Sequence, residues 1–378
     1  MKLLRLPRAK VQLGVPLPWN VRDDKQQLLL SRGHVLRSEN QLEALLERGA
    51  YVDLEEAKLA ERSHVPSPGV AAKRQANLFG LWDELPNELY KLLDKAPETP
   101  GFSARLQDFS TRLIQLIDKD VDIALYHAVR QETAHLFFYG YSHAIHTATL
   151  CLLMARRLAW PQARMMSLVN AALTMNLAIL GLQGAMAKQD VPMRESQKKQ
   201  VRRHPQDAVD MLTKLGVDDP EWLTAVAQHH ERPDGSGYPG GLQELNQSAV
   251  ALRVTDVFMA KISPRATRPA LPIKDAARAL FQEDGGGPIS SAIIKEFGIY
   301  PPGDVVKLAS GEVGVVMRRT ANAKCPIVSA LTDAQGHNTT RTQRRDTSVP
   351  EHAIVASLTD KSVVARLPPE RVYGYSGA

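Results

Sequence analysis

Histidine is the feature of this chain with the clearest chemical potential. The 378 residues include 11 histidines, most of them between His127 and His230. Neutral imidazole binds transition metals such as iron, manganese or zinc, and a carboxylate oxygen can complete or bridge such a site. The candidate ligands are His143, His146, His204, His229, His230 and Asp256. Their spacing alone is not diagnostic, because two histidines three residues apart on one helical face are as often structural as ligating.

The most specific segment begins at the adjacent pair His229 and His230. Neighbouring residues of a helix point about 100° apart, so both rings can reach one metal ion only at a helix end. The string runs HHERPDGSGYP over residues 229–239. Its two glycines and its prolines favour tight turns and a close approach of the backbone to a ligand. Tyr238 adds a hydroxyl and an aromatic face.

This string resembles the loop that gives the HD-GYP family part of its name. His146-Thr147 and His204-Pro205 resemble the first and third elements of the family, and Asp256 within Thr-Asp-Val resembles the last. The similarity covers about residues 100–317 and includes the segment YPPGDVVKLASGEVGVV. It implies a helical, metal-dependent phosphodiesterase domain that acts on cyclic di-GMP.

The resemblance also implies roles for individual residues. The metal, expected to be iron, manganese or zinc, would be held by His146, His204, His229, His230 and Asp256. The ligand would be contacted by Gly237, Tyr238, Pro239, Arg265 and Arg268. Guanidinium groups suit phosphate oxygens because their N–H groups form a planar fork. The intact GYP loop further implies a possible contact with a partner signalling domain.

The second element of the family pattern is altered in this chain. Where the family usually has Leu-His-Asp-Ile-Gly-Lys, the His position is Met175, the Asp position is Asn176 and the Lys position is Ile179. The carboxylate that often precedes the first His falls at Ser142. A carboxylate can bridge two cations, whereas neutral Asn offers one carbonyl oxygen. We expect Met175 and Ile179 to be core residues and a two-metal centre to be strongly weakened.

Two functions follow from these motifs. We predict a cyclic-di-GMP signalling protein with impaired catalysis, which acts by binding the ligand or a partner. The alternative is an active phosphodiesterase with a rearranged site on the five predicted metal ligands. The sequence leaves open whether the site holds a single metal ion or is an empty polar pocket. It also leaves open whether the chain forms a homodimer.

Composition excludes other classes of function. Lys and Arg number 47 against 41 Asp and Glu, a net charge of +6. No nucleic-acid contact is expected, because no basic and aromatic platform accompanies this mild excess. The two cysteines, Cys151 and Cys325, indicate a reducing compartment. No apolar run of about 18 residues is evident, so we expect a cytoplasmic protein without a membrane span.

The predicted fold is mainly α, an HD-type helical bundle with two small additions. Residues 1–60 are predicted to form a small α+β or β-rich module, and residues 61–77 a linker rich in Pro, Gly, Ser and charge. Residues 78–300 carry successive helical patterns, for example Phe102, Leu106, Phe109, Leu113 and Ile117. Residues 301–378 are predicted to be a β appendage, with strands VVKL and VGVVM around Ser310-Gly311 and a loop or irregular strands up to Pro350.

Overall fold

A computed structural model describes the chain over residues 3–6, 10–11, 13–36, 38–47, 49–53, 56, 78–96, 100–130, 138–266, 268–360, 364 and 367–373. The chain divides into two compact units. The first comprises Met1–Glu84, Thr339–Gln343 and Asp360–Ala378, and the second Leu85–Asn338 and Arg344–Thr359. The predicted linker over residues 61–77 lies outside the described residues.

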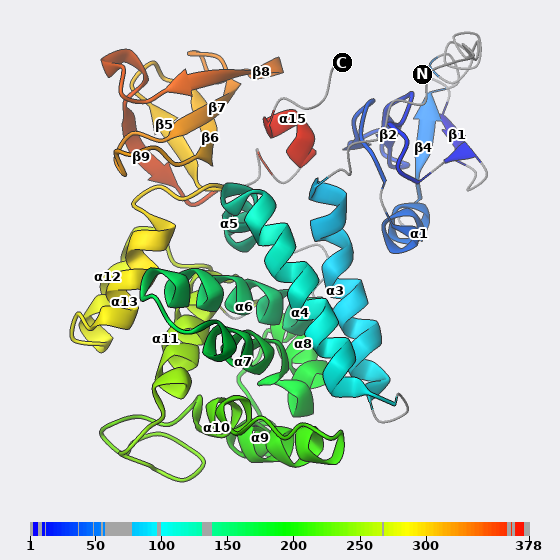
Figure 1. The fold of residues 1–378 in the computed structure, drawn as a ribbon. Helices are drawn as coiled ribbons and strands as arrows, with labels where there is room; N and C mark the ends of the chain where they lie inside the picture. Colours follow the sequence, from blue (N-terminus) through cyan, green and yellow to red (C-terminus); the bar gives the residue numbers. More distant parts are fainter. Residues whose placement is uncertain are drawn as a thin grey trace. The chain divides into compact units, whose positions relative to one another are not determined.

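The second unit is mostly helical, as predicted (Figure 1). Its long helices before the altered element are α3 (Leu78–Asp94, which begins in the first unit), α4 (Phe102–Lys119), α5 (Val121–Arg130), α6 (Tyr139–Arg157) and α7 (Gln162–Thr174). After it come η4 (Leu177–Ile179), α8 (Leu180–Lys188), α9 (Glu195–Lys214), α10 (Pro220–Gln228), α11 (Gln247–Ile262), α12 (Ile273–Glu283) and α13 (Pro288–Phe297). The helical periodicity is confirmed in α4, where the five predicted apolar residues are all buried.

Helices α6 and α7 pack against each other at the centre of this unit (Figure 1). Helix α6 is buried along most of its length, because α7, α8, α11 and α13 all pack against it. Contrary to the expectation that the chain has no apolar run of about 18 residues, the stretch Gln162–Lys188 is apolar enough and long enough to cross a membrane. Of its most apolar window, however, 72% is buried inside the protein, as in the core helix of a soluble protein.

Helix α7 ends just before the altered element of the family pattern. Thr174 is its last residue, and the chain then turns through the short 3-10 helix η4 into α8. The Thr174 hydroxyl accepts a hydrogen bond from the indole Nε1 of Trp222 at 2.8 Å and donates to the Asn170 carbonyl at 2.7 Å. Trp222 belongs to α10, so this bond ties the end of α7 to the helix that leads into the His229-His230 pair.

A five-stranded antiparallel sheet follows α13, with the order β8-β7-β6-β5-β9. The predicted strands appear as β5 (Val305–Leu308) and β6 (Val313–Arg318). The region expected to be a loop or irregular strands contains the strands β7 (Ile327–Thr332) and β8 (Asn338–Asp346), and β9 (Ile354–Leu358) follows it.

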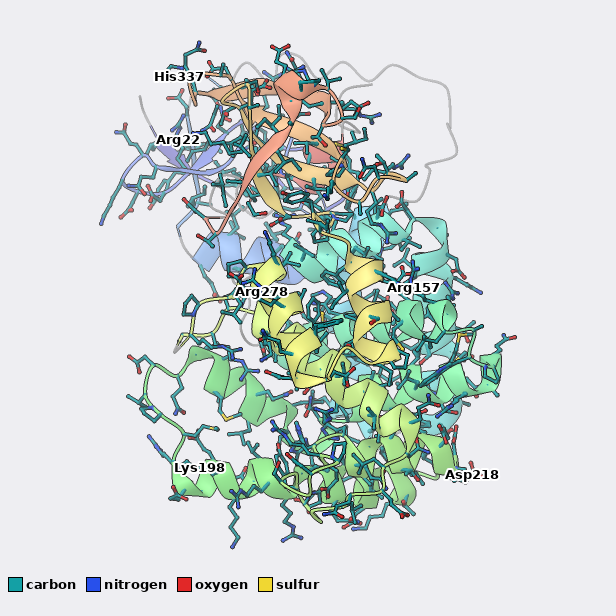
Figure 2. The ribbon with its side chains drawn as sticks, turned by 90° about the vertical axis from the view of Figure 1, so that its left-hand side faces the viewer. Arg22, Arg157, Lys198, Asp218, Arg278 and His337 are labelled. Carbon is teal, nitrogen blue, oxygen red and sulfur yellow. The ribbon has the colours of Figure 1, made fainter. Side chains whose placement is uncertain are left out.

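Charged side chains attach this sheet to the helices. Arg319 donates to Asp122 of α5 at 2.6 Å and to the Glu296 carbonyl of α13 at 2.7 Å. Arg157 at the end of α6 forms an ion pair with Glu296 (Figure 2).

The N-terminal module is a small α+β structure, as predicted. Its strands β1 (Leu3–Arg5), β2 (Val21–Arg22), β3 (Leu28–Leu30) and β4 (Tyr51–Asp53) form a sheet in the order β1-β4-β2-β3. Helix α1 spans Glu39–Glu47. Within its described residues, the segment 11–19 contributes an isolated bridge between Pro16 and Val35. Trp19, Val21, Leu42 and Val52 belong to the buried core of the module.

Candidate metal centre and ligand site

Three histidines gather at one point of the helical unit. His204 comes from α9, and His229 and His230 follow the last residue of α10. One ligand nitrogen from each ring lies within 4.8 Å of the others. Because α10 ends at Gln228, both members of the adjacent pair reach the same point. Within the described ranges, these are the His, Cys, Asp or Glu side chains that form a group suited to a metal ion.

Two backbone carbonyls orient these rings. His204 Nδ1 lies 2.6 Å from the Val201 carbonyl, and His229 Nδ1 lies 2.6 Å from the Val226 carbonyl. The Val201 carbonyl is available because Pro205, four residues later, has no N–H to donate to it. The Val226 carbonyl is available because α10 ends two residues later. A carbonyl oxygen can only accept a hydrogen bond, so Nδ1 of both rings carries the proton. Nε2 of both rings then carries a lone pair that can bind a metal ion.

The two Nε2 atoms of His204 and His229 face each other at 3.1 Å. Two lone pairs at this separation repel unless a cation lies between them. Two nitrogens bound to one zinc ion at 2.0–2.1 Å in tetrahedral geometry are roughly 3.3–3.4 Å apart. A carbonyl on the far nitrogen is also the usual means of orienting a metal-bound imidazole. The residues present therefore fit a transition metal ion.

Burial keeps the three imidazoles in their neutral, metal-binding form. It lowers the pKa of His204, and burial together with the neighbouring rings of His230 and His204 lowers the pKa of His229 well below 6.5. The pKa of His230 falls to about 3, first through burial and then through His204 and two nearby arginines. Metal binding needs deprotonated imidazole nitrogen, so these environments favour it at neutral pH.

The loop after His230 packs against this cluster through Tyr238. The Tyr238 ring stacks on the His230 ring with centroids 4.6 Å apart and planes at 27°. The Tyr238 N–H donates to the His230 carbonyl at 3.1 Å. Burial raises the pKa of Tyr238, so its hydroxyl stays protonated and can donate to a ligand. The GYP segment is thus attached directly to the three-histidine cluster.

A buried carboxylate organises the same loop. Glu231 is 1% exposed and accepts hydrogen bonds from the N–H groups of Gly240 at 2.5 Å and Leu242 at 3.0 Å. Gly237 crosses the backbone of Glu231 so closely that a Cβ there would lie 2.4 Å from the Glu231 Cα. The sequence motif contains Glu231 but does not indicate its role, because its partners are backbone groups that only the folded loop brings to it.

Asp256 of α11 is paired with His143 of α6. His143 Nε2 donates to Asp256 Oδ1 at 2.7 Å. Burial raises the pKa of Asp256, but the hydrogen bond from His143, together with the electrostatic influence of His143, His229 and Arg265, brings it below its usual value. The carboxylate is therefore ionised. In turn the carboxylate raises the pKa of His204 and His229 against the larger effect of burial, so it lies within electrostatic range of the three-histidine cluster.

His146, the predicted first ligand, lies one helical turn beyond His143. Its pKa is lowered to about 3 by burial and by His143. It is not a member of the three-histidine group. His143 Nδ1 is buried, and within the described part of the chain it has no hydrogen-bond partner. The His143–Asp256 pair therefore lacks the orienting carbonyl that His204 and His229 possess.

The altered positions form packed core. Met175 is fully buried, Asn176 is 5% exposed and Ile179 is 6% exposed. Asn176 directly precedes η4, and Ile179 is the last residue of η4. This short helix packs against α9, the helix that carries His204. The three altered positions provide neither the imidazole nor the carboxylate that the family pattern has there, and hydrocarbon fills most of the space instead.

The two predicted phosphate-binding arginines differ in their surroundings. Arg265 donates from Nε to the Tyr139 hydroxyl at 3.0 Å, and its guanidinium lies 5.3 Å from the centre of that ring. Arg268 is exposed and donates to the Ala260 carbonyl at 2.5 Å. Only Arg265 contributes to the lowered pKa of Asp256, so it is the arginine of this pair nearer to the site.

Comparison with known proteins agrees with this architecture. Residues 113–286 match the family model described as HD domain. The chain is 30% identical over 185 residues to the cyclic di-GMP phosphodiesterase PA4108 of Pseudomonas aeruginosa, covering 48% of this chain and 45% of that protein. It is 28% identical over 217 residues to 3'3'-cGAMP-specific phosphodiesterase 3 of Vibrio cholerae, covering 54% and 46%. The chain thus spans less than half the length of these curated relatives.

A solved structure has the same fold. Bd1817, an HDG"Y"P protein from Bdellovibrio bacteriovorus, superimposes with a TM-score of 0.52 at 16% identity, covering 78% of this chain and 99% of that one. The predicted HD-type helical fold is confirmed. Residues 113–286 match an HD domain, and the similarity to these proteins supports the predicted resemblance to the HD-GYP family, with Thr-Met-Asn where the His-Asp motif usually stands.

Proposed function

We propose that this chain binds a cyclic dinucleotide, cyclic di-GMP first of all, and acts as a signalling effector with little or no hydrolytic activity. The observation that carries the proposal is the packed Met175, Asn176 and Ile179 beside an intact three-histidine cluster. The named activities of the relatives, on cyclic di-GMP and on 3'3'-cGAMP, support the class of ligand.

Binding is supported by groups that suit a phosphate diester. His204, His229 and His230 would hold one transition metal ion, which when bound offers a Lewis-acid contact to a phosphate oxygen. Arg265 presents a guanidinium near the same place, and the Tyr238 hydroxyl is a protonated donor on the loop after His230. The net charge of +6 also favours an anionic ligand.

Weak hydrolysis is supported by the absence of a bridging carboxylate at Asn176. A neutral amide cannot offset the repulsion between two cations, and it offers one oxygen where a carboxylate offers two. The remaining carboxylate, Asp256, is engaged by His143. Efficient positioning and deprotonation of a water nucleophile therefore lack their usual support.

The test uses the full chain reconstituted with iron, manganese or zinc. Calorimetric titration should show binding of cyclic di-GMP, and chromatography of the same samples should show no steady conversion to linear dinucleotide. The double variant Met175→His/Asn176→Asp should gain bound metal and measurable turnover. The matched control Met175→Leu/Asn176→Ser should gain neither.

Two results would overturn the proposal. Absence of cyclic-dinucleotide binding would refute the ligand class. Steady turnover by the unaltered chain would instead establish the alternative, a phosphodiesterase with a rearranged site, and His230→Ala should then abolish that turnover. A partner at the GYP loop and a cytoplasmic location stay predictions.

A further inference from the structure

Tyr139 connects two parts of the site that are far apart in sequence. It is the first residue of α6, one turn before His143. Its ring stacks on the His143 ring, with centroids 5.7 Å apart and planes at 12°. Its hydroxyl accepts the hydrogen bond from Arg265 Nε, and its face lies under the Arg265 guanidinium. A single side chain therefore contacts both the cation and the histidine that pairs with Asp256.

The charges around Tyr139 explain why such a contact is needed. Arg265 is bonded to Tyr139 and Asp256 to His143, and the Tyr139 and His143 rings stack, so a guanidinium and a carboxylate belong to one small cluster where their opposite charges favour a salt bridge. That salt bridge would consume the cation needed for a phosphate and the carboxylate that lies within electrostatic range of the histidine cluster. The Tyr139 hydroxyl instead occupies Arg265 Nε, and within the described part of the chain neither Nη of Arg265 has a hydrogen-bond partner.

We infer that Tyr139 is a positioning residue for anionic ligands: its hydroxyl holds Arg265 with the two Nη groups free for a phosphate, while its ring holds the His143–Asp256 pair. This inference rests on the proposed function and deepens it. It assigns the Tyr139 hydroxyl to ligand affinity and leaves metal binding to the three histidines.

The decisive variant is Tyr139→Phe, which keeps the stacked ring and removes only the hydroxyl. Loss of one hydrogen bond of ordinary strength should weaken cyclic-di-GMP binding about three- to tenfold. Bound metal, measured by elemental analysis, should not change. In an Arg265→Ala background the same substitution should have no further effect, because the hydroxyl acts only through that guanidinium.

Tyr141→Phe is the matched control. It makes the same chemical change two residues along the same helix, where Tyr141 is buried and packs on Tyr90 with ring centroids 5.4 Å apart. Because this ring contacts neither Arg265 nor His143 in any described interaction, ligand affinity should match that of the unaltered chain.

A second measurement addresses the geometry without any ligand. The Arg265 Nε–H resonance should exchange slowly with solvent in the unaltered chain and rapidly in Tyr139→Phe. If the unaltered chain binds no cyclic di-GMP, the proposed function fails and this exchange experiment still decides the position of Arg265. The inference is overturned if Tyr139→Phe binds like the unaltered chain, if its loss persists without Arg265, or if the Nε–H exchange does not change.

Discussion

The buried carboxylate of Glu231 gives the sharpest test of how the GYP loop is built. Glu231→Gln preserves shape and removes charge. A carboxylate accepts the N–H groups of both Gly240 and Leu242, whereas an amide has one oxygen and must turn its NH₂ group toward one of those donors. One charge-assisted hydrogen bond is lost and two donors face each other in a partly buried position. The expected local cost is about 2–3 kcal/mol.

Hydrogen exchange measures this cost where it arises. The amides of Gly240 and Leu242 should exchange about 30- to 150-fold faster in Glu231→Gln, the factor that corresponds to 2–3 kcal/mol. Glu244→Gln, an exposed residue of the same loop, is the control and should leave both rates unchanged. Equal protection in Glu231→Gln and the unaltered chain would refute the role of the carboxylate.

Three further predictions concern the metal, pH and the loop backbone. His204→Ala should lose the bound transition metal in elemental analysis, whereas His146→Ala should retain it, and the reverse pattern would contradict the three-histidine site. Since the pKa of His146 is lowered to about 3, only the unfolded chain takes up this proton below pH 6.5. As the pH falls below 6.5, the free energy of unfolding, measured in urea, should therefore fall more steeply in the unaltered chain than in His146→Asn, by about 1.4 kcal/mol per pH unit. Parallel pH profiles of the two proteins would refute this. Gly237→Ala should abolish ligand binding, because its Cβ would lie 2.4 Å from the Arg232 amide nitrogen; calorimetry showing unchanged affinity would disprove the close approach.

The sequence alone was sufficient to predict those parts of the site and the fold that are formed by residues close together in the chain. The string from His229 to Pro239 contains two ligands and the loop that packs against them, so its order alone predicts a site. The helical periodicity of α4 and the strands around Ser310-Gly311 also follow from local pattern. Strand β8 was not predicted as regular, because its residues are almost all polar and its conformation depends on pairing with β7.

The choice of the partner for Asp256 needed the folded chain. His143 and His146 are three residues apart on one helix, and spacing along the sequence does not say which of them faces α11. Packing of α6 against α11 turns His143 toward Asp256. The bond between Tyr139 and Arg265 likewise joins residues 126 positions apart.

The amino-acid sequence by itself determined the family resemblance, the helical class and the presence of Met175 and Asn176 where that family has its His-Asp pair, because these are matters of residue identity and order. The tertiary structure decided which side chains meet. It brought His204 to the end of α10, placed freed carbonyls behind two of the three rings, and packed Met175 and Ile179 into the core. Distances between separate helices are set by how their side chains fill the space between them, and that is information no single helix carries.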